Sequence, residues 1–160
     1  MTVRPAKFGD INRLAELLEQ GYQRSKYRDR GSIIIKETKA LLVNAIQRHG
    51  LKSAGGSCVF VSEHDGLVDG FIAGLLDRVY HIGDKLSATD FFFYVAPDGS
   101  PTSAGGLIDA FIDWALDIET VAEIRLAATD IIQDYERTAA LYRRKGFTQT
   151  GVIYERRTDE

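Results

Sequence analysis

A tyrosine near the end of the sequence is the first residue whose type and position could serve chemistry. Tyr142 lies one turn before Gly146, which ends a helix predicted over residues 134–145. A phenol has a pKa near 10, so it stays protonated at neutral pH and can give a proton or a hydrogen bond to a developing anion. The alternative is that Tyr142 shares a helix face with Tyr135 and Ala139 and packs its ring against a sheet.

A base that accepts a proton would have to be a carboxylate or a histidine. Asp90 opens a strongly apolar strand predicted over residues 88–96, and alternation along that strand places it on one face with Phe92 and Tyr94. We expect Asp90 to be either this base or a cap or partner of a nearby cation. Three further candidates are better explained as a solvated strand end and a loop residue: Glu63, His64 and His81.

A turn rich in glycine and serine follows this strand and leads into a helix predicted over residues 107–117. Successive backbone amides and a helix N-terminus form an anion site, and glycines let the backbone approach a ligand closely. A serine there can cap the helix or donate its hydroxyl to a phosphate. The residues that could contact such an anion are Ser100, Ser103, Ala104, Gly105 and Gly106. The alternative is a serine-capped helix without a ligand.

Length and composition indicate one domain with a full core. The chain has 160 residues, of which 44% are hydrophobic and 27% charged. A formal net charge of −3 gives no global attraction to nucleic acid or to an anionic membrane. Cys58 has no second cysteine to pair with, no apolar run reaches the roughly 20 residues of a membrane helix, and the N-terminus lacks a signal-peptide core. These features favour a cytoplasmic protein, and the scattered histidines do not predict a metal site.

Hydrophobic periodicity and turn signals predict the elements that must position these residues. The predicted helices begin near Asp10, with an apolar stripe to Leu18, and then cover residues 36–49, 107–117 and 134–145. The predicted strands cover residues 3–6, 57–64, 68–79, 88–96, 124–128 and 148–155. The second and third of these strands should form a hairpin at Asp65-Gly66.

This order of elements, the hairpin, the turn before the third helix and the final LYRRKGF resemble the GCN5-related N-acetyltransferase (GNAT) family over nearly the whole chain. The resemblance implies a single-domain α/β fold over residues 1–160, with a mixed, mostly antiparallel sheet flanked by helices. It also implies transfer of an acetyl group from acetyl-CoA to a primary amine without a metal. Two alternatives stay open: a GNAT fold that serves as a binding or scaffold protein, and an enzyme acting on nucleic acid or a nucleic-acid-bound target.

The resemblance assigns roles to the residues of the fourth strand and the last helix. In the family, the tyrosine that Tyr142 matches often protonates the departing thiolate of CoA, and some members carry a glutamate near Asp90. The fourth and fifth strands of the family splay apart. The backbone of Phe93, Tyr94 and Val95 is therefore expected to pair with the pantetheine arm as an added strand would.

The turn departs from the family. Its pattern there is Arg/Gln-x-x-Gly-x-Gly/Ala, which binds the pyrophosphate of the acyl-CoA. Ser100 stands at the basic or amide position, Ser103 replaces a glycine, and Gly105 matches. The family also often has an asparagine where this chain has Tyr135. Both departures concern the cofactor site.

A basic and aromatic segment follows the first predicted helix, with Arg24, Lys26, Arg28 and Arg30 around Tyr22 and Tyr27. In the family this region borders the acceptor site, so Tyr27, Arg28 and Arg30 are expected to contact the acceptor. An acidic acceptor would suit these cations, and a nucleic acid backbone is the less favoured partner. The alternative is a solvated loop. Because the family often dimerises, a homodimer is a further expectation, whereas the identity of the acceptor stays open.

Overall fold

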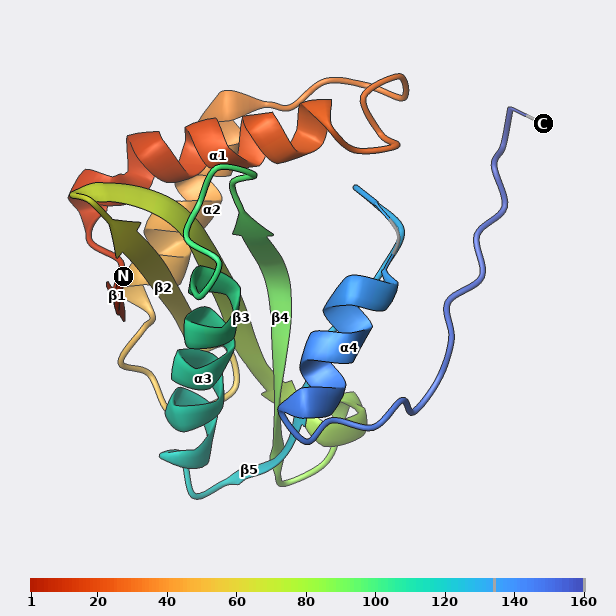
Figure 1. Ribbon diagram of the computed structural model, residues 1–160. Helices are drawn as coiled ribbons and strands as arrows, with labels where there is room; N and C mark the ends of the chain where they lie inside the picture. The colour runs from red at the N-terminus through yellow and green to blue at the C-terminus, as the bar shows by residue number, and fades with distance from the viewer. Residues whose placement is uncertain (134, 160) are drawn as a thin grey trace.

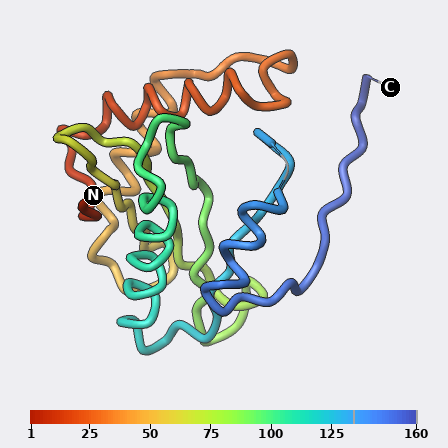
Figure 2. Tube along the Cα trace, in the orientation of Figure 1, coloured from red at the N-terminus to blue at the C-terminus, as the bar shows by residue number. Residues whose placement is uncertain are grey.

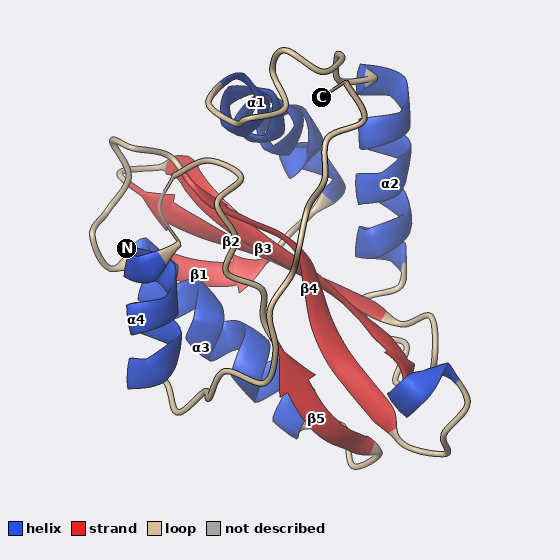
Figure 3. Cartoon of the chain, turned by 90° about the vertical axis from the view of Figure 1, so that its right-hand side faces the viewer, coloured by secondary structure: helices blue, strands red, loops and turns tan. Residues whose placement is uncertain are grey.

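A five-stranded sheet forms the centre of the protein, and helices cover both of its faces (Figures 1 and 3). The computed structural model describes residues 1–133 and 135–159. The strands lie in the order β1 (Thr2–Pro5), β2 (Ser57–His64), β3 (Leu67–Arg78), β4 (Leu86–Val95) and β5 (Val121–Arg125). Pairing is antiparallel from β1 to β4 and parallel between β4 and β5. The predicted mixed, mostly antiparallel α/β fold is confirmed.

Two apolar cores lie on opposite faces of this sheet because strand side chains alternate between the faces. The helices α1 (Ile11–Gln23) and α2 (Ile35–Gln47) cover the first core, which contains Leu14, Leu42 and Phe71. The helix α3 (Ser103–Leu116) covers the second core, where Phe111 and Cys58 are fully buried. Cys58 thus serves as a small buried apolar residue of β2. In the described part of the chain, no helix combines the length and the apolar character that crossing a bilayer requires.

Several element boundaries differ from the sequence-based expectations. The helix α3 begins at Ser103, earlier than predicted, and small residues in its first turn let it approach the N-terminal strand closely. A methyl group on Gly106 would lie 2.9 Å from Met1 Cε. β5 covers Val121–Arg125 rather than residues 124–128, and α4 covers Glu136–Arg144. The predicted helix start at Asp134 lies outside the described residues.

The last predicted strand, over residues 148–155, is wrong. That segment has no regular structure and runs apart from the sheet (Figure 2). Its side chains are mostly exposed, and Ile153 and Tyr154 are 80% and 91% exposed. Alternating apolar residues form a strand only where a sheet edge pairs with them, and no described strand pairs with these residues. Glu155 instead holds the segment through ion pairs to Lys26 and Arg30 at 2.9 and 3.2 Å.

Candidate active site

The strands β4 and β5 separate halfway along β4. Their parallel pairing covers Leu86–Thr89 on β4 and ends at Arg125 on β5. Beyond Thr89, β4 continues to pair with β3 as far as Val95. The splay that the family resemblance predicted is confirmed, and it leaves the edge of β4 from Asp90 to Val95 without a partner among the described strands.

The register shows which backbone groups face this open edge. Ala96 N donates to Asp69 O at 2.8 Å, so the alternation of an antiparallel ladder directs the backbone of Tyr94 towards β3 and that of Phe93 and Val95 towards the edge. Phe93 and Val95 can thus pair with an extended ligand. Tyr94 was also predicted to pair with the ligand, but its backbone faces β3. Its buried side chain points towards α1, where its hydroxyl donates to Gln20 Oε1 at 3.1 Å.

A β-bulge in β4 changes which residues share a face. The register leaves Phe91 as an extra residue, because Phe92 pairs with Ala73 and Asp90 pairs with the next residue, Gly74. Phe91 and Phe92 both pack into the core beneath α1 and α2. Asp90 therefore lies on the opposite face, and the prediction that it shares a face with Phe92 is wrong because the bulge resets the alternation.

The two residues predicted to be catalytic come together where the strands separate. Asp90 Oδ1 accepts a hydrogen bond from Ala127 N at 3.1 Å, and Tyr142 donates its hydroxyl to Ala127 O at 3.0 Å. The Tyr142 side chain is buried, with its ring centroid 6.4 Å from that of Phe93 and 5.9 Å from that of Phe147. The packing predicted as the alternative for Tyr142 is thus present together with the position at the splay.

Burial changes the acidity of both groups. It raises the pKa of Asp90 to about 6, because a carboxylate loses hydration here and the Ala127 N–H compensates only in part. Burial and the nearby charge of Asp90 raise the pKa of Tyr142 above its ordinary value. A carboxyl group that titrates near neutral pH can accept a proton, and a phenol that stays protonated can donate a hydrogen bond.

The turn between β4 and α3 is wrapped around a buried carboxylate, Asp69 of β3. This side chain accepts hydrogen bonds from Ser62 Oγ at 2.5 Å, Ser100 N at 2.7 Å and Ser103 Oγ at 2.8 Å. Burial alone would raise its pKa, but these hydrogen bonds outweigh that effect and hold the pKa below its ordinary value. Sequence reasoning missed Asp69, although an acid between Val68 and the apolar residues of a central strand was a visible signal.

The first turn of α3 leaves two amides available to a ligand. Among the described residues, neither Ala104 N nor Gly105 N has a hydrogen-bond acceptor, and a methyl group on Gly105 would meet open space. Gly106 was predicted to contact the cofactor, but its α-carbon faces Met1 and Val3. Its position therefore serves the close packing of α3 on β1.

The basic segment between α1 and α2 is paired within the chain. Lys26 contacts Asp130 and Glu155 at 2.7 and 2.9 Å, and Arg30 contacts Glu155. Tyr27 lies beneath both cations, with Arg30 Cζ at 5.5 Å from its ring centroid. Most of the positive charge predicted to meet an acceptor is therefore balanced by acids of the chain itself.

Arg28 is the more exposed cation of this segment. Its side chain is 61% exposed and contacts the neighbouring Asp29 at 3.6 Å. An exposed pair of this kind contributes about 0–1 kcal/mol, so Arg28 can leave Asp29 for another anion at little cost.

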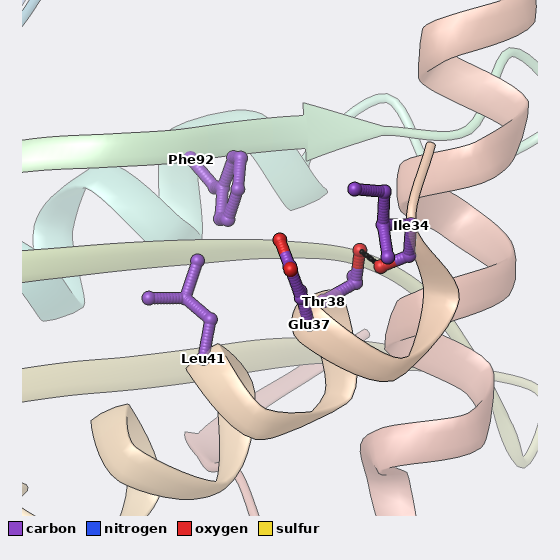
Figure 4. Close-up of a pocket in the computed structure, with 5 residues that line it drawn as sticks. All are labelled: Ile34, Glu37, Thr38, Leu41 and Phe92. Atoms are coloured by element: carbon purple, nitrogen blue, oxygen red, sulfur yellow. Dashed lines mark hydrogen bonds between the residues drawn. The ribbon is translucent and has the colours of Figure 1, made fainter. Parts of the chain in front are cut away.

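An open groove of about 460 Å³ lies between α2 and β4. Ile34, Glu37, Thr38 and Leu41 line it from the helix side, and Phe92 lines it from β4 (Figure 4). Glu37 directs its carboxylate into the groove, where the other side chains are mainly apolar (Figure 4). Sequence reasoning missed this groove because it joins residues that lie far apart in the chain.

Comparison with known proteins finds this fold in solved structures of acetyltransferases. No family model and no curated protein sequence matches the chain. Among solved structures, AAC(6′)-Iy in complex with the bisubstrate analogue CoA-S-monomethyl-acetylneamine aligns with a TM-score of 0.72 at 16% identity, over 98% of this chain and 97% of that one. Ribosomal-protein-alanine N-acetyltransferase from Brucella melitensis biovar Abortus 2308 aligns with a TM-score of 0.67 at 18% identity, over 98% and 99%.

Glucosamine-6-phosphate N-acetyltransferase from Arabidopsis thaliana aligns with a TM-score of 0.70 at 12% identity, over 99% of this chain and 98% of that one. The alignments span nearly the whole of each chain, so the likeness concerns the overall fold and not a single motif. Identities this low concern the fold and leave the substrate open. The chain therefore has the GNAT acetyltransferase fold, with the strand splay and the helix-borne tyrosine at its centre.

Proposed function

We propose that this protein transfers an acyl group, acetyl in the first instance, from a CoA thioester to a primary amine. The observation that carries the proposal is the meeting of Asp90 and Tyr142 at the splay of β4 and β5, bridged by Ala127. A group that can accept a proton and a group that can donate a hydrogen bond thus lie beside an unpaired strand edge. Each of these features can serve acyl transfer from a thioester.

The donor arm would lie along the open edge, where its amides pair with the backbone of Phe93 and Val95. Asp90 would take a proton from the acceptor ammonium, directly or through a water, and the free amine would attack the thioester carbonyl. Backbone amides of β4 would stabilise the oxyanion of the tetrahedral intermediate. As the intermediate collapses, the C–S bond breaks, the nitrogen releases its extra proton to water, and the Tyr142 hydroxyl would donate a hydrogen bond or a proton to the departing thiolate. Any proton that Tyr142 gives would return to it from water.

The groove beside β4 supports a cationic acceptor. It lies on the face of the sheet opposite Asp90, so an acceptor bound there would reach the base past the open edge of β4, where β5 has separated. Glu37 is the charged residue among those that line it, and a carboxylate in a largely apolar groove attracts an ammonium group more than an anion. Lys26 and Arg30, by contrast, are already paired with Asp130 and Glu155. We therefore propose a positively charged amine as the acceptor and give a nucleic acid backbone less weight.

Calorimetric titration with acetyl-CoA and with free CoA tests the proposal, followed by a screen of primary amines that detects the released thiol. We expect micromolar binding and thiol release that depends on the amine. Asp90→Asn should lower turnover while sparing binding, and Asp113→Asn, at an exposed position of α3, serves as the matched control. Absence of binding at millimolar acetyl-CoA would replace the proposal with a binding or scaffold protein that has this fold.

A further inference from the structure

We propose that the turn before α3 does not bind the diphosphate of the acyl donor, because Asp69 of the same chain already fills the anion position. The protein should then use a pantetheine thioester about as well as a CoA thioester. This inference rests on the proposed function and specifies its donor. It follows from how the turn uses its amides, from the charge at the turn and from the packing around Asp69.

Most amides of the turn already have acceptors, either within the turn or on Asp69. From residue 99 to residue 103, the hydrogen bonds are Gly99 N to Ala96 O at 2.9 Å, Ser100 N to Asp69 Oδ2 at 2.7 Å, Thr102 N to Ser100 Oγ at 3.4 Å and Ser103 N to Ser100 O at 3.1 Å. Pro101 has no N–H to offer. A diphosphate needs several convergent donors, and from residue 99 to residue 106 this backbone leaves only the amides of Ala104 and Gly105 without an acceptor among the described residues.

The charge at the turn also opposes a diphosphate. Residues 96–106 contain no lysine or arginine, and the Asp69 carboxylate lies beneath the turn that they form. Lys145, which follows the last residue of α4 and contacts α3, is paired with Asp109 at 2.6 Å. A diphosphate placed here would therefore meet negative charge without a cation of the turn to offset it.

Asp69 and its partners form a packed unit. Ser62 and Ser103 are fully buried and both donate their hydroxyls to this carboxylate. Gly99 lets the backbone approach so closely that an added methyl group would lie 3.0 Å from Asp69 Oδ2. An arriving phosphate could displace the carboxylate only by leaving it buried without hydrogen bonds, which is costly.

The experiment compares the dissociation constants of CoA and pantetheine for the wild-type protein and for Asp69→Asn. We expect the two ligands to differ by less than about tenfold for the wild type. Asparagine keeps the size of the side chain and removes its charge, so Asp69→Asn should widen the difference by at least about fivefold in favour of CoA. Asp98→Asn removes an exposed charge from the same turn and should leave the ratio unchanged. Inorganic pyrophosphate in millimolar excess should not displace pantetheine.

Tight CoA binding with pantetheine weaker by about 100-fold or more would overturn this inference and leave the proposed function standing. A folded Asp69→Asn variant with an unchanged ratio would remove Asp69 from donor selection, as would an equal effect of Asp98→Asn. If Asp69→Asn does not fold, comparison of wild-type affinities for pantetheine, phosphopantetheine and CoA still decides whether the phosphates contribute, separately from the adenosine part. Failure of both ligands to bind would overturn the proposed function, and this inference with it.

Discussion

Asp90→Asn should stabilise the protein at neutral pH even though it removes the proposed base. Burial raises the pKa of Asp90 from 3.8 to about 6. A difference of about 2 pH units corresponds to roughly 3 kcal/mol of unfolding free energy at 1.36 kcal/mol per unit. The site is partly open to solvent, so we expect Asp90→Asn to raise the free energy of unfolding by about 1–2 kcal/mol. The side-chain oxygen of asparagine can still accept the hydrogen bond from Ala127 N.

The sign follows from proton binding. Between about pH 4 and pH 6, the folded protein keeps the Asp90 proton that the unfolded chain has already lost, so wild-type stability falls as pH rises through this interval. The asparagine side chain of the variant does not titrate, so the variant escapes this loss. The difference in unfolding free energy should be near zero at about pH 4 and complete above about pH 6.

Urea denaturation followed by the fluorescence of Trp114, the single tryptophan, measures this difference at about pH 4 and about pH 7.5. Asp69→Asn is the control of opposite sign. Hydrogen bonds hold the pKa of Asp69 below its ordinary value. The ionised Asp69 therefore stabilises the folded protein above about pH 4, and this stabilisation is lost as pH falls. A loss of stability in Asp90→Asn at about pH 7.5, or a gain that is equal at both pH values, would refute the reasoning.

Two further predictions concern Tyr142 and Gly74. Tyr142→Phe keeps the ring packing but removes the hydroxyl that bonds Ala127 O, so turnover should fall by about 100-fold or more with acetyl-CoA affinity unchanged; unchanged turnover would exclude a role as acid or hydrogen-bond donor. Gly74→Ala should lower the free energy of unfolding by about 1–3 kcal/mol, because the new methyl group would overlap the Phe111 ring. Gly105→Ala is its matched control: the methyl group meets open space in a helix, so calorimetry should show an unchanged or higher Tm.

The sequence alone determined the succession of the main helices and strands as far as α4, and it drew attention to Tyr142 on that helix. Hydrophobic periodicity placed β2 at its observed bounds and predicted α1 to α4, because local alternation and helix stops act over only a few residues. The resemblance of the final helix to the GNAT family supplied Tyr142 and the expectation of a splay. Residues marked by such local signals, such as Tyr142, could therefore be named before the fold was known.

Tertiary structure decided what depends on pairing between distant segments. The bulge at Phe91 turned Asp90 to the other face, and only the β3–β4 register could reveal it. The strand predicted over residues 148–155 failed because its alternation found no sheet edge among the described strands. The role of Asp69 depended on hydrogen bonds to Ser62, Ser100 and Ser103, which come from different parts of the chain. A sequence pattern reports which face a residue prefers, whereas long-range pairing decides what that face contacts.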